Sequence, residues 1–391
     1  MRILFISSRF PYPLEKGDKL RAYEFLKQLS KNHEVYLFAL NDHDQPLDYG
    51  DLRLFCKHIS VFTLSRKQIA WNLFRSIFTG KPFQVGYFHS NEARKKLDGL
   101  IAACKPGVIF NQLIRTTEYG HEAQAFRVLD YMDAMSKGME RRLATDTFPL
   151  KLFVRWEYKR LLKYEREVAL HFQQHLVISE QDAEALPMAD KSNLRVIRNG
   201  VDEKFYFPKN LKKDFDLLFQ GNMAYPPNIE SAKFLAMEIM PLVWKVRPET
   251  RLLISGATPA QSVLSMASEK VLIGGWEDDA RTVYWRSKLL VAPMLISIGL
   301  QNKILQAMAM KTPVIMSELA NNAIHAPANC AAVANGAQEF ANAICALLDN
   351  PDRLEEMSEN AYRFVKENYS WNQVGAELNA LIESLPAEGG R

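Results

Sequence analysis

The sequence predicts an α/β protein made of two doubly wound domains with parallel sheets. Short apolar runs typical of buried strands alternate along the chain with segments whose apolar residues recur at helical spacing. A second alternation begins after Asn199-Gly200, and 391 residues are sufficient for two domains that each have a core. We therefore expect an N-terminal domain over residues 1–200, a C-terminal domain over residues 201–365, and a terminal helix in residues 366–391.

The N-terminal domain begins with a strand, a helix and a second strand. Apolar runs predict strands at Ile3–Ser7 and Val35–Ala39, and helical spacing predicts a helix over residues 20–30. The loop before this helix lacks the Gly-x-Gly-x-x-Gly pattern of a dinucleotide site, which disfavours a nucleotide-sugar epimerase or dehydrogenase. Further apolar runs predict strands at Val108–Asn111, Val128–Met132, Leu176–Ser179, Asp216–Phe219, Leu252–Ser255, Val271–Gly274, Leu289–Ala292 and Val314–Met316.

Polar side chains follow two of these strands in the N-terminal domain. Gln112 and Arg115 follow one strand, and Asp130 and Asp133 lie at the end of the next. The carboxyl ends of parallel strands share one edge of the sheet, where ligands of this fold class bind. Two nearby aspartates also fit acid/base chemistry or part of a metal site, while helix capping by Asp133 and a structural role for Asp130 remain open.

The C-terminal domain contains a strand, loop, helix and strand in residues 289–316. The strand leads into a loop of small residues ending at Gly299, and Ile304, Leu305 and Met308 then form one stripe of a helix. In a parallel sheet this arrangement directs backbone N–H groups of the loop and helix N-terminus outward, where they attract phosphate.

The motif in this unit resembles a known family. Gly299-Leu300-Gln301-Asn302-Lys303 and the helix after it are similar to the nucleotide-sugar-binding element of family 4 glycosyltransferases, which have the GT-B fold of two Rossmann-like domains facing a cleft. The closest pattern is that of a bacterial Gly-Leu-Gln-Asn-Lys subgroup associated with polysaccharide assembly. The segments around Gly17 and Gly221 resemble two further glycine loops of the subgroup, and the Gln112 and Asp130 segments resemble elements of its acceptor half.

The resemblance implies a retaining transfer of sugar from a nucleoside diphosphate donor to a hydroxyl, without a metal ion or cofactor. It implies catalytic roles for Lys303 and Arg115, acceptor contacts from Gln112, Asp130 and Asp133, and a terminal helix that crosses back to the first domain. Trp276 is either a partner for the base or a core residue. The implied donor-binding residues are Gly17, Gly221, Asn222, Trp276, Gly299, Leu300, Gln301, Asn302 and Gln306.

Two positions depart from the family pattern. The family uses two glutamates seven residues apart on the donor, and here they are Ile298 and Gln306. Glutamine keeps an acceptor oxygen but loses the charge, and charge-assisted hydrogen bonds are about twice as strong as neutral ones. Basic residues that many members carry after the Gly221 loop are also missing. A binding or scaffold protein that has lost catalysis is therefore the alternative.

Two segments mix basic and aromatic residues, at 65–88 and 151–166. Each contains an apolar helical face, which we expect to pack on the sheet. The alternative is contact with an anionic bilayer, where acceptors of this class of enzyme reside. Nucleic acid is not expected as a partner, because no base-reading motif accompanies these residues.

Composition excludes several classes of protein. The net charge is +4, and 24% of the residues are charged, as in ordinary soluble proteins. Neither a transmembrane helix nor a signal peptide is expected, which indicates a cytoplasmic protein, with association at the inner face of the membrane as an open alternative. The four cysteines have no metal or disulfide spacing. The Asp-x-Asp patterns at 42–44 and 214–216 resemble those of metal-dependent transferases, but so short a pattern arises by chance.

Overall fold

The computed structural model describes residues 1–14, 16–43, 46–145, 148–202, 205–209, 211–275, 279–296 and 300–386. The chain divides into two compact units. Unit 1 consists of Met1–Asn199 and Val374–Arg391, and unit 2 consists of Gly200–Gln373.

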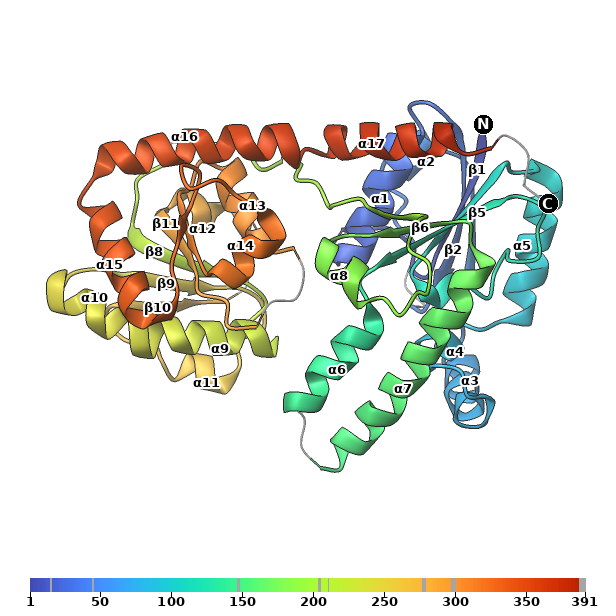
Figure 1. Ribbon diagram of the computed structural model, residues 1–391, viewed down its shortest axis with the longest axis horizontal. Helices are drawn as coiled ribbons and strands as arrows, with labels where there is room; N and C mark the ends of the chain where they lie inside the picture. The colour runs from blue at the N-terminus through green and yellow to red at the C-terminus, as the bar shows by residue number, and fades with distance from the viewer. Residues whose placement is uncertain are drawn as a thin grey trace. The chain divides into compact units, whose positions relative to one another are not determined.

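Unit 1 is built on a seven-stranded parallel sheet in the order β3-β2-β1-β4-β5-β6-β7, with helices on both faces (Figure 1). Its strands are β1 (Arg2–Ser7), β2 (Glu34–Asn41), β3 (Cys56–Thr63), β4 (Val108–Gln112), β5 (Phe126–Met132), β6 (Gln174–Val177) and β7 (Leu194–Val196). Its helices are α1 (Gly17–Leu29), α2 (Leu52–Phe55), α3 (Arg66–Thr79), α4 (Phe83–Tyr87), α5 (Asn91–Cys104), η1 (Ile114–Thr116), α6 (Met135–Thr145), α7 (Leu150–Val168), η2 (Ala169–His171) and α8 (Glu180–Ala185).

Unit 2 repeats this plan with a six-stranded parallel sheet in the order β10-β9-β8-β11-β12-β13. Its strands are β8 (Phe215–Gln220), β9 (Leu252–Ser255), β10 (Val271–Gly274), β11 (Ser287–Ala292), β12 (Val314–Met316) and β13 (Ala332–Val333). Its helices are α9 (Pro226–Phe234), η3 (Leu235–Ile239), α10 (Met240–Val246), α11 (Gln261–Leu264), α12 (Arg281–Trp285), α13 (Asn302–Ala309), α14 (Glu318–Ile324), α15 (Gly336–Leu348) and α16 (Pro351–Asn368).

The last helix, α17 (Trp371–Ser384), packs on α1 of unit 1 from Val374 onward. The Asn379 amide donates to the Gln28 carbonyl at 3.0 Å. Gly375 lies so close to the same side chain that a Cβ there would stand 2.4 Å from Gln28 Oε1. Contact at this distance leaves room for glycine alone at residue 375.

Each sheet has a point at which the order of its strands reverses. In unit 1 this point lies between β1 and β4, and in unit 2 it lies between β8 and β11. Crossover connections leave such a point toward opposite faces, so the loops after its strands diverge and leave a crevice at the carboxyl edge. These loops are the places where a ligand of either unit is expected.

The predicted strands are all present. Apolar residues such as Ile3, Phe5 and Phe110 have no exposed surface, and Phe5 stacks on Phe110 with ring centroids 4.8 Å apart. The first helix begins at Gly17, three residues before its predicted start, and Asp18 in its first turn is favourable near the positive helix end. Apolar spacing did not mark these first residues because they lie outside the core.

The expectation that the aromatic segment at 65–88 packs its apolar face on the sheet is wrong for α3. The buried residues of α3 are the polar Asn72 and Ser76, whereas Trp71 and Phe78 are 63% and 74% exposed. The hydrophobic pattern of a helix gives an apolar side but does not say what covers it. In α3, Ile69 packs against the core of the sheet, but the aromatic residues of the apolar side face away from it.

Three further expectations concern membrane-spanning helices, metal sites and the state of the cysteines. In the described part of the chain, no helix has the length and apolarity that a membrane span requires. Within the same residues, no group of three or more His, Cys, Asp or Glu side chains is placed to hold a metal ion. All four cysteines are free, and burial raises the pKa of the Cys56 thiol to about 12.

Candidate functional site

The strongest candidate site in unit 2 centres on Lys303, in the first turn of α13. Its side chain is buried, with its ammonium nitrogen 4.6 Å from the centre of the Phe219 ring. Burial lowers the pKa of Lys303 to about 7. Among the residues that the structure describes, no carboxylate lies within 4.0 Å of this nitrogen. A buried amine beside a helix N-terminus is suited to bind an anion. The bound anion favours the protonated, positively charged form of the amine.

Asn228 in α9 holds the Lys303 ammonium in place. Lys303 Nζ donates to Asn228 Oδ1 at 2.6 Å, and Asn228 Nδ2 donates to the Asn222 carbonyl at 3.0 Å. One amide therefore joins α13 to the loop that follows β8. This loop and α13 lie on the two sides of the strand reversal in unit 2.

The loop after β8 is tightly packed through two glycines. Gly221 N donates to the Ser255 carbonyl at 3.0 Å, and a Cβ on Gly221 would stand 2.7 Å from Asn228 Nδ2. Gly256, at the end of β9, has a φ of +147°, and a Cβ there would lie 1.6 Å from the Gly221 carbonyl oxygen. Both positions therefore require glycine, and the loop after β8 presents its backbone close to Lys303.

Gly256→Ala is expected to lower the free energy of unfolding by about 3 kcal/mol or more, because the clash is with backbone and cannot be relieved by rotating a side chain. Chemical denaturation measures this loss. Gly99→Ala is the control, since nothing lies within 4 Å of a Cβ there and the position is helical. Equal stability of the two variants would contradict the packing of this loop.

Gln306, one turn further along α13, lies in a network with two tyrosines. Its Nε2 donates to the Tyr206 hydroxyl at 2.9 Å, and its Oε1 accepts from the Tyr284 hydroxyl at 3.2 Å. The same Tyr284 hydroxyl lies 3.2 Å from Gln220 Oε1 at the end of β8. Since a hydroxyl has one proton, Tyr284 donates to one of the two glutamines at a time.

The structure brings together most of the donor-binding residues expected from the sequence. The Asn222 side chain forms a local hydrogen bond, in which its Oδ1 accepts from Ala224 N at 2.9 Å. Six of the expected donor-binding residues lie on the loop after β8, just before α13 or in α13, together with Lys303, which was expected to be catalytic. The six are Gly221, Asn222, Leu300, Gln301, Asn302 and Gln306. Trp276 and Gly299 lie outside the described residues. Gly17 belongs to unit 1, where nothing lies within 4 Å of a Cβ built on it.

Unit 1 has a polar cluster at the carboxyl edge of its sheet, around Arg115. The Arg115 guanidinium donates to Gln84 Oε1 from Nε at 3.0 Å and from Nη2 at 2.6 Å. Its Nη1 lies 3.7 Å from Asp18 Oδ2, which also accepts from Arg9 Nη1 at 2.8 Å. Burial, followed by the charge of Arg9, lowers the pKa of Arg115 to about 10. Arg9 Nε also lies 4.0 Å from Asp42 Oδ2, so the two arginines at this edge are surrounded by carboxylates.

Gln112 lies beside two residues with unusual backbone geometry. Leu113 follows β4 and Met132 ends the neighbouring β5, and both have positive φ, at 65° and 61°. The Gln112 amide donates to the Asp18 carbonyl at 2.8 Å and to Met132 Sδ at 3.5 Å. Positive φ in bulky residues costs about 1–3 kcal/mol each and clusters at functional sites. The strain supports a ligand site at this edge.

Asp130 does not lie at the surface of this edge. Its side chain has no exposed surface, and its two oxygens accept from Arg21 Nε at 2.7 Å and Nη2 at 3.0 Å. Arg21 also donates to Asn199 Oδ1 at 2.9 Å. Buried, bidentate pairing leaves Asp130 no route to an acceptor, so the expected acceptor contact is replaced by a structural role. Single-sequence patterns do not reveal which strand-end carboxylate is covered.

Asp133 differs from Asp130 in reaching solvent. Desolvation by the surrounding protein, together with the charge of Asp182, raises the pKa of Asp133 to about 6. Asp182 itself accepts from Ala134 N at 3.3 Å and from the Ser179 hydroxyl at 2.5 Å. Asp133 therefore remains available to a ligand of unit 1.

Sequence reasoning missed several members of both clusters. Asn228 lies in the Tyr-Pro-Pro-Asn stretch beyond the Gly221 loop, and its position six residues after Asn222 gave no sign that it supports Lys303. Arg9 and Asp18 flank the Gly17 loop, so their location after β1 was a usable signal. Tyr206 and Tyr284 come from distant parts of the chain, and only folding brings them to Gln306.

Comparison with protein families gives a match over residues 214–350 to the model described as "Glycosyl transferases group 1". The matched segment lies within unit 2 and contains every expected donor-binding residue except Gly17. A curated relative, an uncharacterized 44.6 kDa protein in the cps region of Klebsiella pneumoniae, is 21% identical over 96% of this chain and 98% of its own length.

Solved structures with the same fold are distant in sequence. Sucrose-phosphate synthase from Thermosynechococcus elongatus is 15% identical with a TM-score of 0.70, and 98% of each chain is covered. Anabaena HepE, solved in complex with UDP, is 15% identical with a TM-score of 0.67, covering 98% of this chain and 100% of its own. A trehalose-6-phosphate protein of E. coli, bound with UDP-2-fluoro glucose, is 12% identical with a TM-score of 0.64, covering 99% of this chain and 100% of its own.

The fold and the family match both point to glycosyltransferases. Both units have the parallel α/β architecture of GT-B glycosyltransferase structures. Unit 2 therefore contains the segment that matches the group 1 glycosyltransferase model, in a chain with the GT-B fold.

Proposed function

We propose that the protein is a retaining glycosyltransferase that moves a sugar from a nucleoside diphosphate donor to a hydroxyl acceptor. The observation that carries this proposal is Lys303, a buried amine at the start of α13 inside the group 1 segment. A diphosphate needs a cation and backbone N–H groups in a site with little water, and this corner of unit 2 offers both. Complexes of HepE with UDP and with UDP-glucose support a nucleotide sugar as donor.

In the proposed reaction the bond between the anomeric carbon and the diphosphate oxygen breaks, and a bond to the acceptor oxygen forms on the same face of the sugar. The leaving diphosphate gains negative charge, which the Lys303 ammonium and the amides at the start of α13 stabilise. The acceptor hydroxyl gives its proton to the leaving phosphate oxygen. This sequence uses no protein nucleophile and no metal ion.

Acceptor binding is proposed for unit 1, at the carboxyl edge of its sheet. Arg115 and Gln112 follow β4, and Asp133 follows β5. Arg9 and Arg115 lie among Asp18, Asp42 and Asp133, so this edge offers charged donors and acceptors to the hydroxyl groups of a sugar. A lipid-linked sugar or a growing glycan meets this description.

A role in assembling a cell-surface polysaccharide or glycolipid is proposed on two grounds. The relative from Klebsiella pneumoniae is named for the cps region, and it aligns with 96% of this chain. The Leu300–Lys303 motif resembles that of a polysaccharide-associated subgroup. We place the protein in the cytoplasm, where nucleotide sugars are made.

Gln306→Glu is expected to tighten binding of the nucleoside diphosphate about tenfold, because a carboxylate forms stronger hydrogen bonds to ribose hydroxyls than an amide does. Tyr206 can reverse its hydrogen bond and donate to the new carboxylate. Calorimetric titration of both proteins measures the change. A loss of affinity would mean that the pocket is arranged around the amide and that Gln306 does not serve the ribose.

The proposed function is tested by titrating the protein calorimetrically with UDP, GDP, ADP and CMP. Binding of one nucleoside diphosphate, competing with its sugar conjugate, is the expected result and identifies the base. A protein that binds none of the four would contradict the donor site assigned to unit 2.

The alternative is a glycosyltransferase-like protein that binds nucleotide sugars without turning them over. Gln306 in place of an acidic residue favours it, as does the absence of a basic residue directly after Gly221. The two functions are separated by a turnover assay at saturating donor. The alternative predicts tight donor binding with no release of nucleoside diphosphate, even with lipid-linked acceptors present.

A further inference from the structure

Helix α3 in unit 1 buries two polar residues and exposes its aromatic residues. Asn72 Nδ2 donates to the His89 carbonyl at 2.7 Å and to the Tyr87 carbonyl at 3.3 Å. Ser76 lies so close to α4 that a Cβ on Gly86 would stand 1.8 Å from Ser76 Oγ. Polar bonds and close packing therefore fix α3 with a defined orientation on the protein.

The outward side of α3 carries large apolar residues. Phe74 is 53% exposed and Phe78 is 74% exposed, with their rings in edge contact at 5.3 Å. The ring centroids of Trp71 and Phe74 lie 5.8 Å apart along the same side. Water is a poor environment for three adjoining aromatic rings, and a contiguous apolar patch on a soluble protein marks an interaction surface.

The first half of α7 continues this patch. Leu152 is 60% exposed, and Phe153 is 48% exposed. Arg160 joins the two helices, because it donates to the Ile77 carbonyl at 3.0 Å while its guanidinium lies 3.5 Å from the centre of the Trp156 ring. We define the docking face as residues 66–79 of α3 and 150–160 of α7.

The docking face is strongly basic. Residues 66–79 contain three Lys and Arg and no acid, and residues 150–160 contain four Lys and Arg and one acid, Glu157. Glu157 is buried and accepts from the Phe83 backbone N–H at 2.8 Å, so it presents no charge outward. The two segments carry a net +6 against +4 for the whole chain, so the rest of the chain is net negative.

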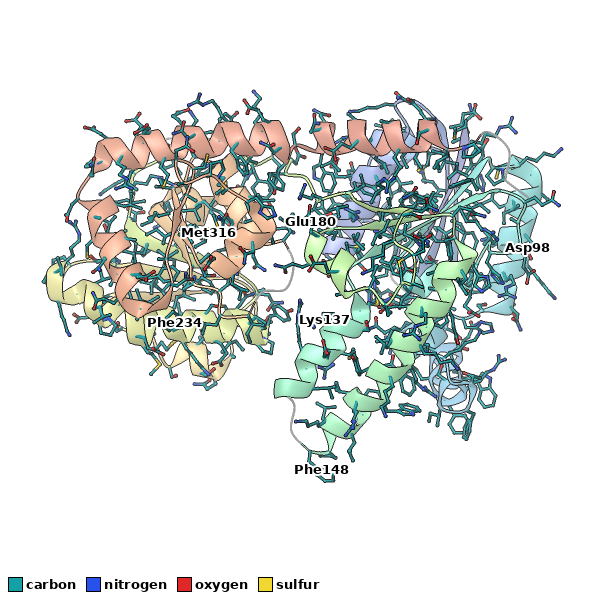
Figure 2. All side chains as sticks on the ribbon, in the orientation of Figure 1. Asp98, Lys137, Phe148, Glu180, Phe234 and Met316 are labelled. Carbon is teal, nitrogen blue, oxygen red and sulfur yellow. The ribbon has the colours of Figure 1, made fainter. Side chains whose placement is uncertain are left out.

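We propose that the docking face binds an anionic lipid bilayer. Lys and Arg around exposed aromatic and aliphatic rings match a bilayer surface, where the rings enter the headgroup region and the cations meet lipid phosphates. Charge complementarity selects this occupant over a second copy of the chain, because two copies of a +6 face repel each other. Figure 2 shows Phe148 at the end of the α6–α7 hairpin, in line with this use of the hairpin as a projection.

A small hollow beside α3 adds to this charge. Arg75, Lys81 and His89 are among the residues that line it. Desolvation, followed by the charges of Lys81 and Arg75, lowers the pKa of His89, while Glu118, which pairs with Lys81, opposes these charges. A phosphate of a lipid headgroup is the anion that this position favours when the adjoining rings are in the bilayer.

Helix α4 connects the docking face to the acceptor edge. The ring centroid of Phe83 lies 5.2 Å from that of Trp156, which belongs to the docking face. The next residue, Gln84, accepts two hydrogen bonds from the Arg115 guanidinium. Tyr87, on the same helix, donates to Asp42 at 3.2 Å. This step rests on the proposed function: a lipid-linked acceptor in the bilayer would have its sugar or phosphate near Arg115.

Vesicle cosedimentation tests the proposal with the full chain. The protein is expected to bind phosphatidylcholine vesicles that contain phosphatidylglycerol, to bind vesicles of phosphatidylcholine alone more weakly, and to be released by salt, since lipid charge is screened. Failure of the wild-type protein to bind vesicles containing phosphatidylglycerol would overturn the proposal.

The triple variant Phe74→Ser, Phe78→Ser and Leu152→Ser should reduce the partition coefficient about tenfold or more, because each removed side chain loses its transfer into the bilayer. The matched control replaces Leu54, Leu170 and Met237 by serine, three side chains at least as exposed that lie outside the docking face. A triple variant that binds as tightly as this control would contradict the assignment.

A second arm replaces Lys67, Arg75, Lys151 and Lys159 by glutamine, which should remove the preference for phosphatidylglycerol. A third arm reads the geometry by fluorescence. Brominated lipids should quench the tryptophan fluorescence of the wild type, and should quench that of the double variant Trp71→Phe with Trp156→Phe much less. Equal quenching of the two proteins would place other tryptophans at the bilayer and overturn the assignment.

Sedimentation velocity without lipid separates the bilayer from a protein partner. Self-association that the triple variant abolishes, with no vesicle binding, would assign the face to a dimer and overturn the proposal. Nucleotide titration of the triple variant separates the two proposals of this article, because a lost bilayer contact should leave donor binding at Lys303 unchanged.

Discussion

Replacing Lys303 by methionine should lower kcat/KM for the nucleotide sugar by about 10²–10³, the usual cost of losing one preorganised group at a developing anion. The expected loss lies mainly in kcat, because charge on the diphosphate grows as the sugar departs. Methionine matches the length of the lysine stem and keeps the apolar contact with Phe219. Steady-state kinetics at saturating acceptor provide the measurement.

Folding should survive this substitution. The pKa of Lys303 falls from near 10.5 to about 7 on folding, so between these values the unfolded chain holds more protons than the folded chain. The free energy of unfolding of the wild type therefore rises with pH across this window. At pH values below the window the buried ammonium is charged, and this charge lowers the free energy of unfolding. Lys303→Met lacks the charge, so its stability should not show this dependence.

Donor binding should depend on pH through the same residue. Above pH 7 the free amine is largely neutral and must take up a proton when a diphosphate binds, so affinity should fall by up to about tenfold per pH unit. Calorimetry at pH 8 in buffers of different ionisation enthalpy measures the uptake. A pH-independent affinity in the wild type, or unchanged kinetics in Lys303→Met, would remove this residue from the mechanism.

The largest effect on stability is expected at Arg21. Arg21→Met should lower the free energy of unfolding by about 3–5 kcal/mol, because it leaves the Asp130 carboxylate buried without its partner. Asp130→Asn should be less harmful, since an amide keeps an acceptor for Arg21 and carries no charge. Thermal and chemical denaturation of each variant give the comparison.

Two further results decide whether Asp130 is structural. The double variant Arg21→Met with Asp130→Leu should recover part of the stability that Arg21→Met loses, because neither charge then remains buried. Asp130→Asn, where folded, should keep the wild-type KM for the acceptor, whereas Asp133→Asn should raise it. A raised acceptor KM in Asp130→Asn alone would restore Asp130 to the acceptor site.

The architecture could be predicted because its signals are local. Fully buried parallel strands are short apolar runs bounded by polar loops, and runs such as Ile3–Ser7 and Leu289–Ala292 form strands as predicted. The place of the site was also predictable from topology, since Gly221 and Lys303 follow the strands on either side of the order reversal in unit 2.

What escaped prediction depends on contacts between distant segments. Asp130 and Asp133 are three residues apart and look alike in the sequence, but Arg21 from α1 covers only the first of them. Asn228 gained its role from Lys303, which is 75 residues away in the chain. The orientation of α3 was missed because helical periodicity identifies an apolar side without revealing whether protein or another phase lies against it.

The measurement that tests the central claim most directly is an NMR time course of the matching nucleotide sugar with protein and a lipid-linked acceptor. The account predicts protein-dependent release of nucleoside diphosphate, a product with the anomeric configuration of the donor, and loss of both in Lys303→Met. Binding without release under all acceptors tried, or release that persists unchanged in Lys303→Met, would contradict it.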